Sequence, residues 1–143
     1  MDSISHKPSK IVDTFDLNGK KNGYLLELGK NGKKTTSYLT VALPGCFKGY
    51  HMHVVRASNY VCIKGRVNVL MFRKDIPDRL EIEMSADKPS QLTIPIDTPT
   101  AISNPYEDEG WLINVPDPPY DPDLLHEQVD MNEDQVREWL RND

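Results

Sequence analysis

Most of what the sequence says about its fold lies in one stretch, which reads Gly45-Cys46-Phe47-Lys48-Gly49-Tyr50-His51-Met52-His53. Side chains two residues apart on a β-strand point to the same face, so His51 and His53 would share a face. Their neighbours Phe47, Tyr50 and Met52 are too apolar for a strand that meets solvent on both sides. We therefore expect the two histidines to face a cavity, as a metal corner or an acid/base site. The alternative is a hydrogen-bonded pair on a half-exposed strand.

Short apolar or alternating runs on both sides of this stretch predict further β-strands. They span residues 10–17, 24–28, 37–43, 60–63, 67–72, 80–84, 92–96 and 111–115. Asn-Gly pairs at 18–19, 22–23 and 31–32 separate several runs and favour tight turns. So many short strands predict an all-β fold, an antiparallel jelly-roll sandwich or barrel.

The C-terminal part has a different character. Residues 116–122 are rich in proline, which excludes a central strand or a helix and predicts an extended segment. Asn132 and Gln135 have the spacing of a capping box, so we expect a short helix that ends near residues 139–141. The whole reads as one domain over residues 1–143, with a barrel at about 10–116 and an extension with the helix at about 117–143.

Charge is divided unevenly along the chain. The formal net charge is -5, yet residues 28–74 hold nine Lys or Arg and no acidic residue, while residues 75–143 hold eighteen Asp or Glu against four Lys or Arg. The acidic balance argues against nucleic acid or a membrane surface as partner. The acid-free stretch contains both histidines and favours a small anionic ligand, with a solvated strand face as the alternative.

Compartment signals favour the cytoplasm. No apolar run approaches the roughly 20 residues that span a bilayer, and the N-terminus lacks the apolar region of a secretory signal. Cys46 and Cys62 are too few for a disulfide scaffold, which favours a reducing environment.

The histidine stretch resembles the first motif of the cupin superfamily. The matching positions are Gly45, His51, His53 and Gly65. Ala57 and Ser58 stand where metal-binding cupins carry a glutamate. The second motif is matched at Pro95 and Asn104, with Asp97 in place of its glycine and Thr100 in place of its histidine. Two of the four ligands of a metal-binding cupin are thus replaced, and we expect no metal or other cofactor.

Residues 37–120 resemble the dTDP-4-dehydrorhamnose 3,5-epimerase family of metal-free cupins. The similar segments are 44–51, 64–67, 92–95 and 114–120. The resemblance implies that His51 is the base that removes a proton next to a ketone, and that Lys48 meets a nucleotide diphosphate. Ser58, Ile113 and Thr100 stand where the family has a lysine, a tyrosine and the second-motif histidine. The sugar 3,4-ketoisomerases are also similar, and there His51 and His53 would move protons between neighbouring carbons.

We therefore expect His51 and His53 to be catalytic. The expected substrate-binding residues are Lys48, Tyr50, Arg56, Ser58, Tyr60, Arg66, Thr100, Asn104 and Trp111. The partner implied by the resemblance is a nucleotide-diphosphate sugar, and a homodimer formed through an added strand is implied in the same way.

Two functions remain open. The first is an epimerase or isomerase of a dTDP-4-keto-6-deoxyhexose in deoxysugar or surface-glycan synthesis. The second is a catalytically reduced cupin that binds a sugar nucleotide or assists a partner enzyme, favoured by the replaced lysine, tyrosine and second-motif histidine.

Overall fold

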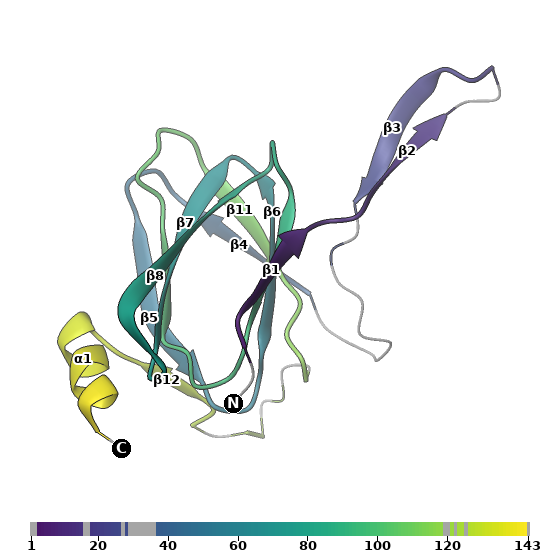
Figure 1. Cartoon of the computed structure of the whole chain (residues 1–143). Coiled ribbons are helices and arrows are strands. Elements are labelled where there is room, and N and C mark those ends of the chain that lie inside the picture. Colours follow the sequence, from purple (N-terminus) through teal and green to yellow (C-terminus); the bar gives the residue numbers. More distant parts are fainter. Residues whose placement is uncertain are drawn as a thin grey trace.

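A computed structural model describes residues 3–15, 18–26, 28, 37–118, 121, 123–124 and 126–142. Within them, two five-stranded antiparallel sheets face each other (Figure 1). The first sheet has the order β1 (Ser5–Pro8), β9 (Ser90–Ile94), β6 (Ser58–Lys64), β11 (Gly110–Asn114), β4 (Tyr38–Ala42). The second has the order β12 (Gln128–Asp130), β5 (Phe47–His53), β10 (Thr100–Ser103), β7 (Arg66–Arg73), β8 (Ile76–Ser85). This confirms the predicted all-β, cupin-type jelly roll.

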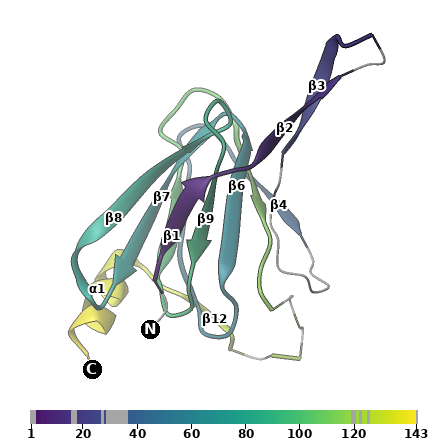
Figure 2. The same cartoon turned by 45° about the vertical axis from the view of Figure 1, so that its right-hand side comes forward.

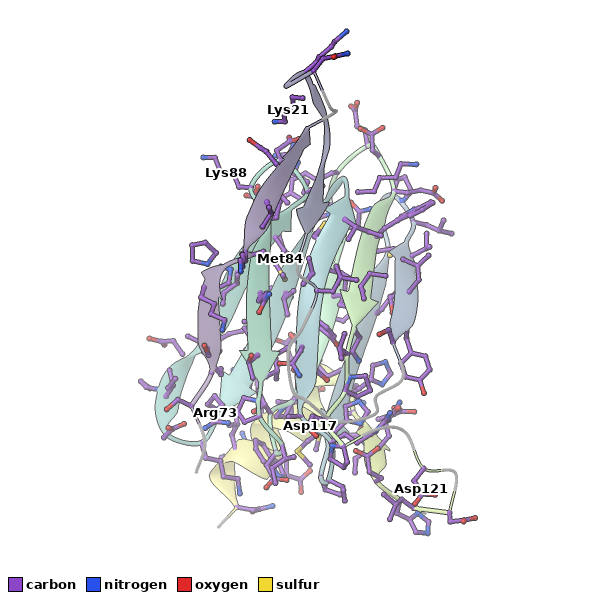
Figure 3. The ribbon with its side chains drawn as sticks, turned by 90° about the vertical axis from the view of Figure 1, so that its right-hand side faces the viewer. Lys21, Arg73, Met84, Lys88, Asp117 and Asp121 are labelled. Atoms are coloured by element: carbon purple, nitrogen blue, oxygen red, sulfur yellow. The ribbon has the colours of Figure 1, made fainter. Side chains whose placement is uncertain are left out.

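The main core lies between the two sheets. Val67, Val69 and Met71 point inward from β7 and pack with Leu112 of β11, and all four are almost completely buried. Met84 of β8 joins them in the interior of the molecule (Figure 3). Because alternate residues of a strand point to opposite faces, the other residues of β7 face outward.

A second cluster of buried residues covers the outer face of the second sheet. Leu70 and Phe72 of β7 pack there with Tyr50, and helix α1 (Glu133–Arg141) supplies the fully buried Val136. The helix therefore lies against the outside of this sheet (Figure 1). Asn132 caps it as predicted, in a capping box with Gln135 at hydrogen-bond distances of 2.8 Å.

A β-bulge divides β5 where it approaches β10. His51 lies opposite Thr100 and Lys48 opposite Ile102, so two residues of β5 face the single residue Ala101. One of them is Gly49, with a φ of 140°, where an added Cβ would come within 2.7 Å of the Ala101 backbone. The extra residue reverses the alternation, so Lys48 points to the same side as His51.

A separate hairpin of β2 (Ile11–Phe15) and β3 (Lys21–Leu26) projects from the body (Figures 1 and 2). Lys21 stands near its outer end (Figure 3) and pairs with Asp13 at 3.1 Å. Ile11 and Val12 are each 45% exposed. Since adjacent strand residues point to opposite faces, this part of the hairpin is uncovered on both sides.

The predicted strands agree with the structure, with a few differences. Three strands of low apolar content were not expected, namely β1, β10 and β12. The sheets thus extend beyond the expected barrel range at both ends. Strands β2 and β3, which overlap the expected strands at 10–17 and 24–28, form the projecting hairpin. The expected turn at residues 22–23 is wrong, because both residues belong to β3. The predicted turn at 31–32 lies outside the described residues, as do residues 119, 120 and 122 of the proline-rich segment.

Within the described residues, no helix is long and apolar enough to cross a membrane.

Candidate active site

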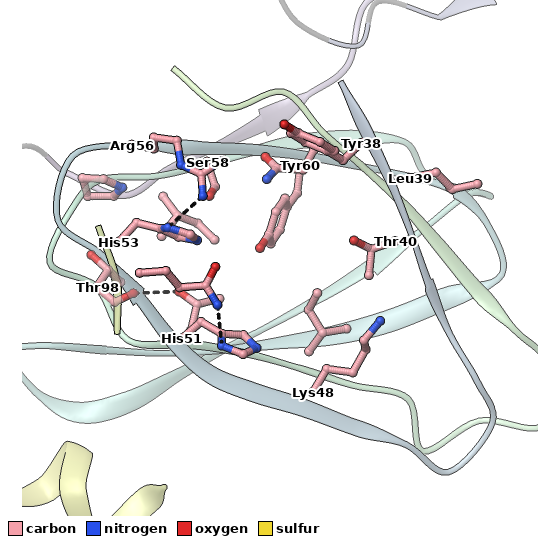
Figure 4. Close-up of a pocket in the computed structure, with 16 residues that line it drawn as sticks. Tyr38, Leu39, Thr40, Lys48, His51, His53, Arg56, Ser58, Tyr60 and Thr98 are labelled. Atoms are coloured by element: carbon pink, nitrogen blue, oxygen red, sulfur yellow. Dashed lines mark hydrogen bonds between the residues drawn. The ribbon is translucent and has the colours of Figure 1, made fainter. Parts of the chain in front are cut away.

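A cavity of about 550 Å³ opens between the two sheets (Figure 4). The second sheet contributes Lys48, His51, His53, Thr100, Ile102 and Gln128. The first sheet contributes Tyr38, Leu39, Thr40, Ser58, Tyr60, Ile94 and Asn114. Arg56, Pro95 and Thr98 from the connecting segments complete the lining. The volume suits a small organic ligand.

His51 forms a dyad with a carboxylate of the C-terminal strand. Its Nδ1 lies 2.6 Å from Oδ1 of Asp130, which is directly opposite in the β12–β5 pairing. Hydrogen bonds from Gln128, at 2.9 Å, and from His51 hold the pKa of Asp130 below its usual range. An ionised carboxylate can only accept a hydrogen bond, so the Nδ1 of His51 carries a proton toward it.

His53 meets a second carboxylate from the same segment. Its Nδ1 lies 3.1 Å from both oxygens of Glu127, the residue before β12. Arg56 also binds Glu127, through its backbone N–H and its Nε, each at 3.1 Å. The side chains of His53, Glu127 and Arg56 are 23%, 7% and 11% exposed. This cluster is therefore better shielded from solvent than the His51 dyad.

The pKa of Glu127 reflects two opposing effects. Burial alone would raise it, because a charged carboxylate loses hydration. The hydrogen bonds from His53 and from the Arg56 backbone, with the positive charges of these residues, outweigh burial and leave the pKa below its usual range. Glu127 is therefore ionised at neutral pH.

Tyr60 faces the histidines from the opposite sheet (Figure 4). Burial raises the pKa of its phenol, against the opposing effects of a hydrogen bond with Ser58 and the charge of Arg56. The hydroxyl thus keeps its proton at neutral pH and can donate it.

Lys48 brings a positive charge to the cavity. Its Nζ donates to the carbonyl of Val41 at 3.3 Å. Among the described residues, the lining contains two lysine or arginine side chains, Lys48 and Arg56. Arg56 pairs with Glu127, whereas Lys48 is not held by a carboxylate of the described residues. An anionic group at the mouth of the cavity would meet Lys48.

The cavity gathers seven of the predicted site residues. They are Lys48, His51, His53, Arg56, Ser58, Tyr60 and Thr100. Their roles in binding or catalysis remain predictions, but the structure brings them to one place.

Four other predicted residues, Tyr50, Arg66, Asn104 and Trp111, lie outside the lining of this cavity. Tyr50 is next to His51 on β5 and therefore points to the outer face, where its ring is tilted against that of Phe72 with centroids 5.5 Å apart. Arg66 lies 3.8 Å from the ring centroid of Tyr106, beside a different hollow.

Asn104 and Trp111 also lie away from the cavity. Asn104 is fully buried, and its Nδ2 donates to the carbonyls of Ala42 and Asp108 at 2.8 Å each. Trp111 lies on β11 next to the inward-facing Leu112, which places it on the outer face, with Lys64 over its ring at 4.6 Å. Neither side chain reaches the cavity.

The carboxylates are what sequence reasoning missed. Glu127 and Asp130 lie more than 70 residues after the histidines, in an acidic tail. No local pattern predicts that this tail forms an edge strand beside β5. Tyr38 and Gln128 also line the cavity unpredicted.

Metal ligation needs three or more donors around one point. Within the described residues, no three His, Cys, Asp or Glu side chains are gathered in that way. The donors here are instead arranged as two histidine–carboxylate pairs.

Solved structures with this architecture were found by fold comparison. A dTDP sugar isomerase from Desulfovibrio desulfuricans has a TM-score of 0.76 at 13% identity, over 99% of this chain and 90% of that one. The 3'-monoepimerase ChmJ from Streptomyces bikiniensis, solved with dTDP-quinovose, has a TM-score of 0.71 at 14% identity, over 97% and 73%. The sugar 3,4-ketoisomerase QdtA from Thermoanaerobacterium thermosaccharolyticum has a TM-score of 0.68 at 17% identity, over 94% and 93%. At these identities the likeness establishes the fold.

The facing sheets and the histidine-lined cavity between them define a cupin-type protein. The chain belongs to the family described as the polysaccharide biosynthesis C-terminal domain, whose model matches residues 18–123. Among curated proteins, none matches the sequence at a significant level.

Proposed function

We propose that the protein is an epimerase or isomerase of a dTDP-linked 4-keto-6-deoxyhexose, acting in deoxysugar or surface-glycan synthesis. The observation that carries this proposal is the pair of histidines that enter one cavity, each with a carboxylate on its Nδ1. The family assignment and the sugar-nucleotide enzymes that share the fold point the same way.

The chemistry starts with a proton on the carbon next to the ketone. A neutral imidazole whose Nδ1–H is held by a carboxylate has its Nε2 lone pair free to take that proton. The electron pair of the broken C–H bond moves toward the ketone oxygen and forms an enolate. Nearby positive charge and hydrogen-bond donors stabilise this developing oxyanion.

Two outcomes of the enolate fit the cavity. His51 and His53 project from one strand, so they can take the proton from C3 and deliver a proton to C4 on the same side of the sugar. The proton of the C3 hydroxyl moves to the former ketone oxygen at C4, which leaves a ketone at C3 and completes the ketoisomerase outcome. Tyr60 stands on the facing sheet and can return a proton from the other side, which inverts the centre and is the epimerase outcome.

Lys48 is the proposed contact for the diphosphate of the nucleotide. A charge-assisted hydrogen bond to phosphate is stronger than one between neutral groups. Ser58 and Thr100 would contact the sugar, since both line the cavity and are mostly buried.

The alternative is a cupin that binds a sugar nucleotide without transforming it. It is favoured by Ser58, a short hydroxyl side chain that is 5% exposed where the epimerase resemblance expects a lysine. Without that lysine, stabilisation of the enolate oxygen falls to other residues of the cavity.

Product analysis separates the two. Purified protein would be incubated with dTDP-4-keto-6-deoxyglucose, and the mixture analysed by NMR for a 3-epimer, a 3,5-epimer or a 3-keto isomer. We expect one of these with the wild type and none with His51→Asn. Saturable binding without any conversion by the wild type would overturn the enzyme proposal and favour the binding protein.

We also propose a homodimer in the cytoplasm. The projecting hairpin supports the dimer, because a two-stranded hairpin is marginally stable in water and Ile11 and Val12 are exposed on it. Light scattering during size exclusion would give twice the 16.3 kDa chain mass, and a monomer at micromolar concentration would contradict the dimer.

A further inference from the structure

Glu127 is buried beside the cavity without being one of the residues that line it in the described structure. It directly precedes β12 and interacts with His53 and Arg56 at the same time. Since Glu127 does not line the cavity, any effect of its carboxylate on a substrate passes through the residues it binds, His53 and Arg56.

The carboxylate of Glu127 is fixed by donors on both oxygens. The backbone N–H of Arg56 donates to Oε1 and its Nε donates to Oε2, each at 3.1 Å. The main chain also ties this segment to β5, because the N–H of Val54 donates to the Glu127 carbonyl at 3.0 Å. The remaining acceptor capacity of both oxygens faces the Nδ1 of His53, at 3.1 Å from each.

This arrangement decides which ring nitrogen of neutral His53 carries the proton. An ionised carboxylate has no proton to donate, so the nitrogen that faces it must be the N–H. Nη2 of Arg56 also approaches Nδ1, at 3.4 Å, and would favour the opposite tautomer. The carboxylate contacts are two in number and shorter, and placing the Nδ1 lone pair against them would be repulsive.

We propose that Glu127, held in place by Arg56, is a positioning residue that fixes His53 in the Nδ1–H tautomer and leaves its Nε2 lone pair for the cavity. The catalytic part of this inference rests on the proposed function, in which His53 exchanges protons with the substrate. The tautomer itself is a property of the free protein. Arg56 accordingly acts by holding Glu127 in place.

The tautomer can be read from the ¹⁵N chemical shifts of the imidazole rings, measured at a pH high enough to keep them neutral. The His53 signals are assigned by their loss in His53→Gln. We expect the Nδ1–H form in the wild type. Glu127→Gln should move the signals toward the Nε2–H form, because the new amide can donate to Nδ1 and Arg56 loses its ionic partner. Glu138→Gln, the same change on the exposed side of α1, should leave them unchanged.

Two results would overturn the inference: the Nε2–H form in the wild type, or His53 signals that Glu127→Gln leaves in place. The wild-type spectrum alone is decisive should the variant fail to fold. This readout is independent of substrate, so it holds even where the wild type lacks activity and the proposed function fails.

Activity provides the second readout. If the wild type transforms the sugar nucleotide, Glu127→Gln should lower kcat by about 100-fold, since a well-placed general base contributes roughly 10²- to 10⁴-fold. The dissociation constant for dTDP should stay within about twofold, because Glu127 does not line the cavity. Glu127→Asp, which keeps the acceptor, should recover part of the lost rate. An unchanged kcat in Glu127→Gln would remove the positioning role.

Discussion

At Gly49, a single residue determines which side chains of β5 reach the cavity. The bulge there adds one residue opposite Ala101, so Lys48 joins His51 on the inner face. In a regular strand, Lys48 and His51 would point to opposite faces. The positive charge and the proton-transfer groups are therefore brought together by the backbone at this point.

Substitution of Gly49 tests how far the bulge depends on a glycine at this position. Both Gly49 and Gly45 have a positive φ, of 140° and 76°, but only at Gly49 would a Cβ meet the backbone of another strand. Gly45→Ala should cost about 1–2 kcal/mol of unfolding free energy from backbone strain alone. Gly49→Ala should cost clearly more, measured by urea unfolding. Equal losses in the two variants would argue against the close approach.

Lys48→Met should weaken the binding of dTDP about tenfold, which corresponds to about 1.4 kcal/mol. The substitution removes the positive charge of Lys48, which has no carboxylate partner among the described residues of the cavity. Isothermal titration at low salt measures the effect, with Lys88→Met as the matched control because Lys88 lies at another hollow. Equal affinities of Lys48→Met and wild type would contradict this role.

At the scale of the elements, the short strand β12 brings the C-terminal tail next to the two histidines of the cavity. It pairs with β5 and brings Asp130 to His51, while the preceding Glu127 reaches His53. Helix α1 follows directly and is anchored through Val136 on the outer face of the same sheet. Docking of the tail and orientation of the histidines are therefore linked.

This link predicts how stability depends on pH. The pKa of Glu127 is lowered in the folded protein from its ordinary value of 4.5, so its carboxylate stabilises the fold above that value. The contribution is lost as the pH falls below 4.5 toward the lowered pKa. Glu127→Gln should thus show a shallower loss of unfolding free energy between pH 5 and roughly pH 3 than the wild type. Parallel curves from urea unfolding would contradict the lowered pKa, and Glu138→Gln serves as control.

The sequence predicted the elements whose residues carry a local pattern. Apolar alternation indicated β4, β6, β7 and β11, and the Asn132–Gln135 capping box indicated α1. The histidine spacing placed His51 and His53 on one face of a strand beside a cavity. Each of these properties depends on residues within a few positions of one another.

Features that depend on distant contacts could not be predicted in this way. Strand β12 has three residues and no apolar pattern, and it exists because β5 offers it a free edge. The inward position of Lys48 follows from the bulge, since regular alternation cannot anticipate an extra residue. Asn104 matched a motif, but its amide donates to the carbonyls of Ala42 and Asp108.

At the scale of the whole molecule, the basic and acidic parts of the chain occupy different positions around the cavity. The acid-free stretch, residues 28–74, supplies most of the cavity wall, including Lys48 and both histidines. The acidic half supplies Glu127 and Asp130, which sit behind the histidines and outside the lining. An acidic protein can therefore present a locally basic cavity to an anionic sugar nucleotide.

The central claim is that this cavity removes a proton next to a ketone. The most direct measurement is deuterium incorporation into dTDP-4-keto-6-deoxyglucose in D₂O, followed by NMR at the ring carbons. We predict rapid exchange at one or both carbons beside the ketone with the wild type, and loss of that exchange in His51→Asn. Saturable binding of the sugar nucleotide with no exchange above the protein-free rate would contradict the claim.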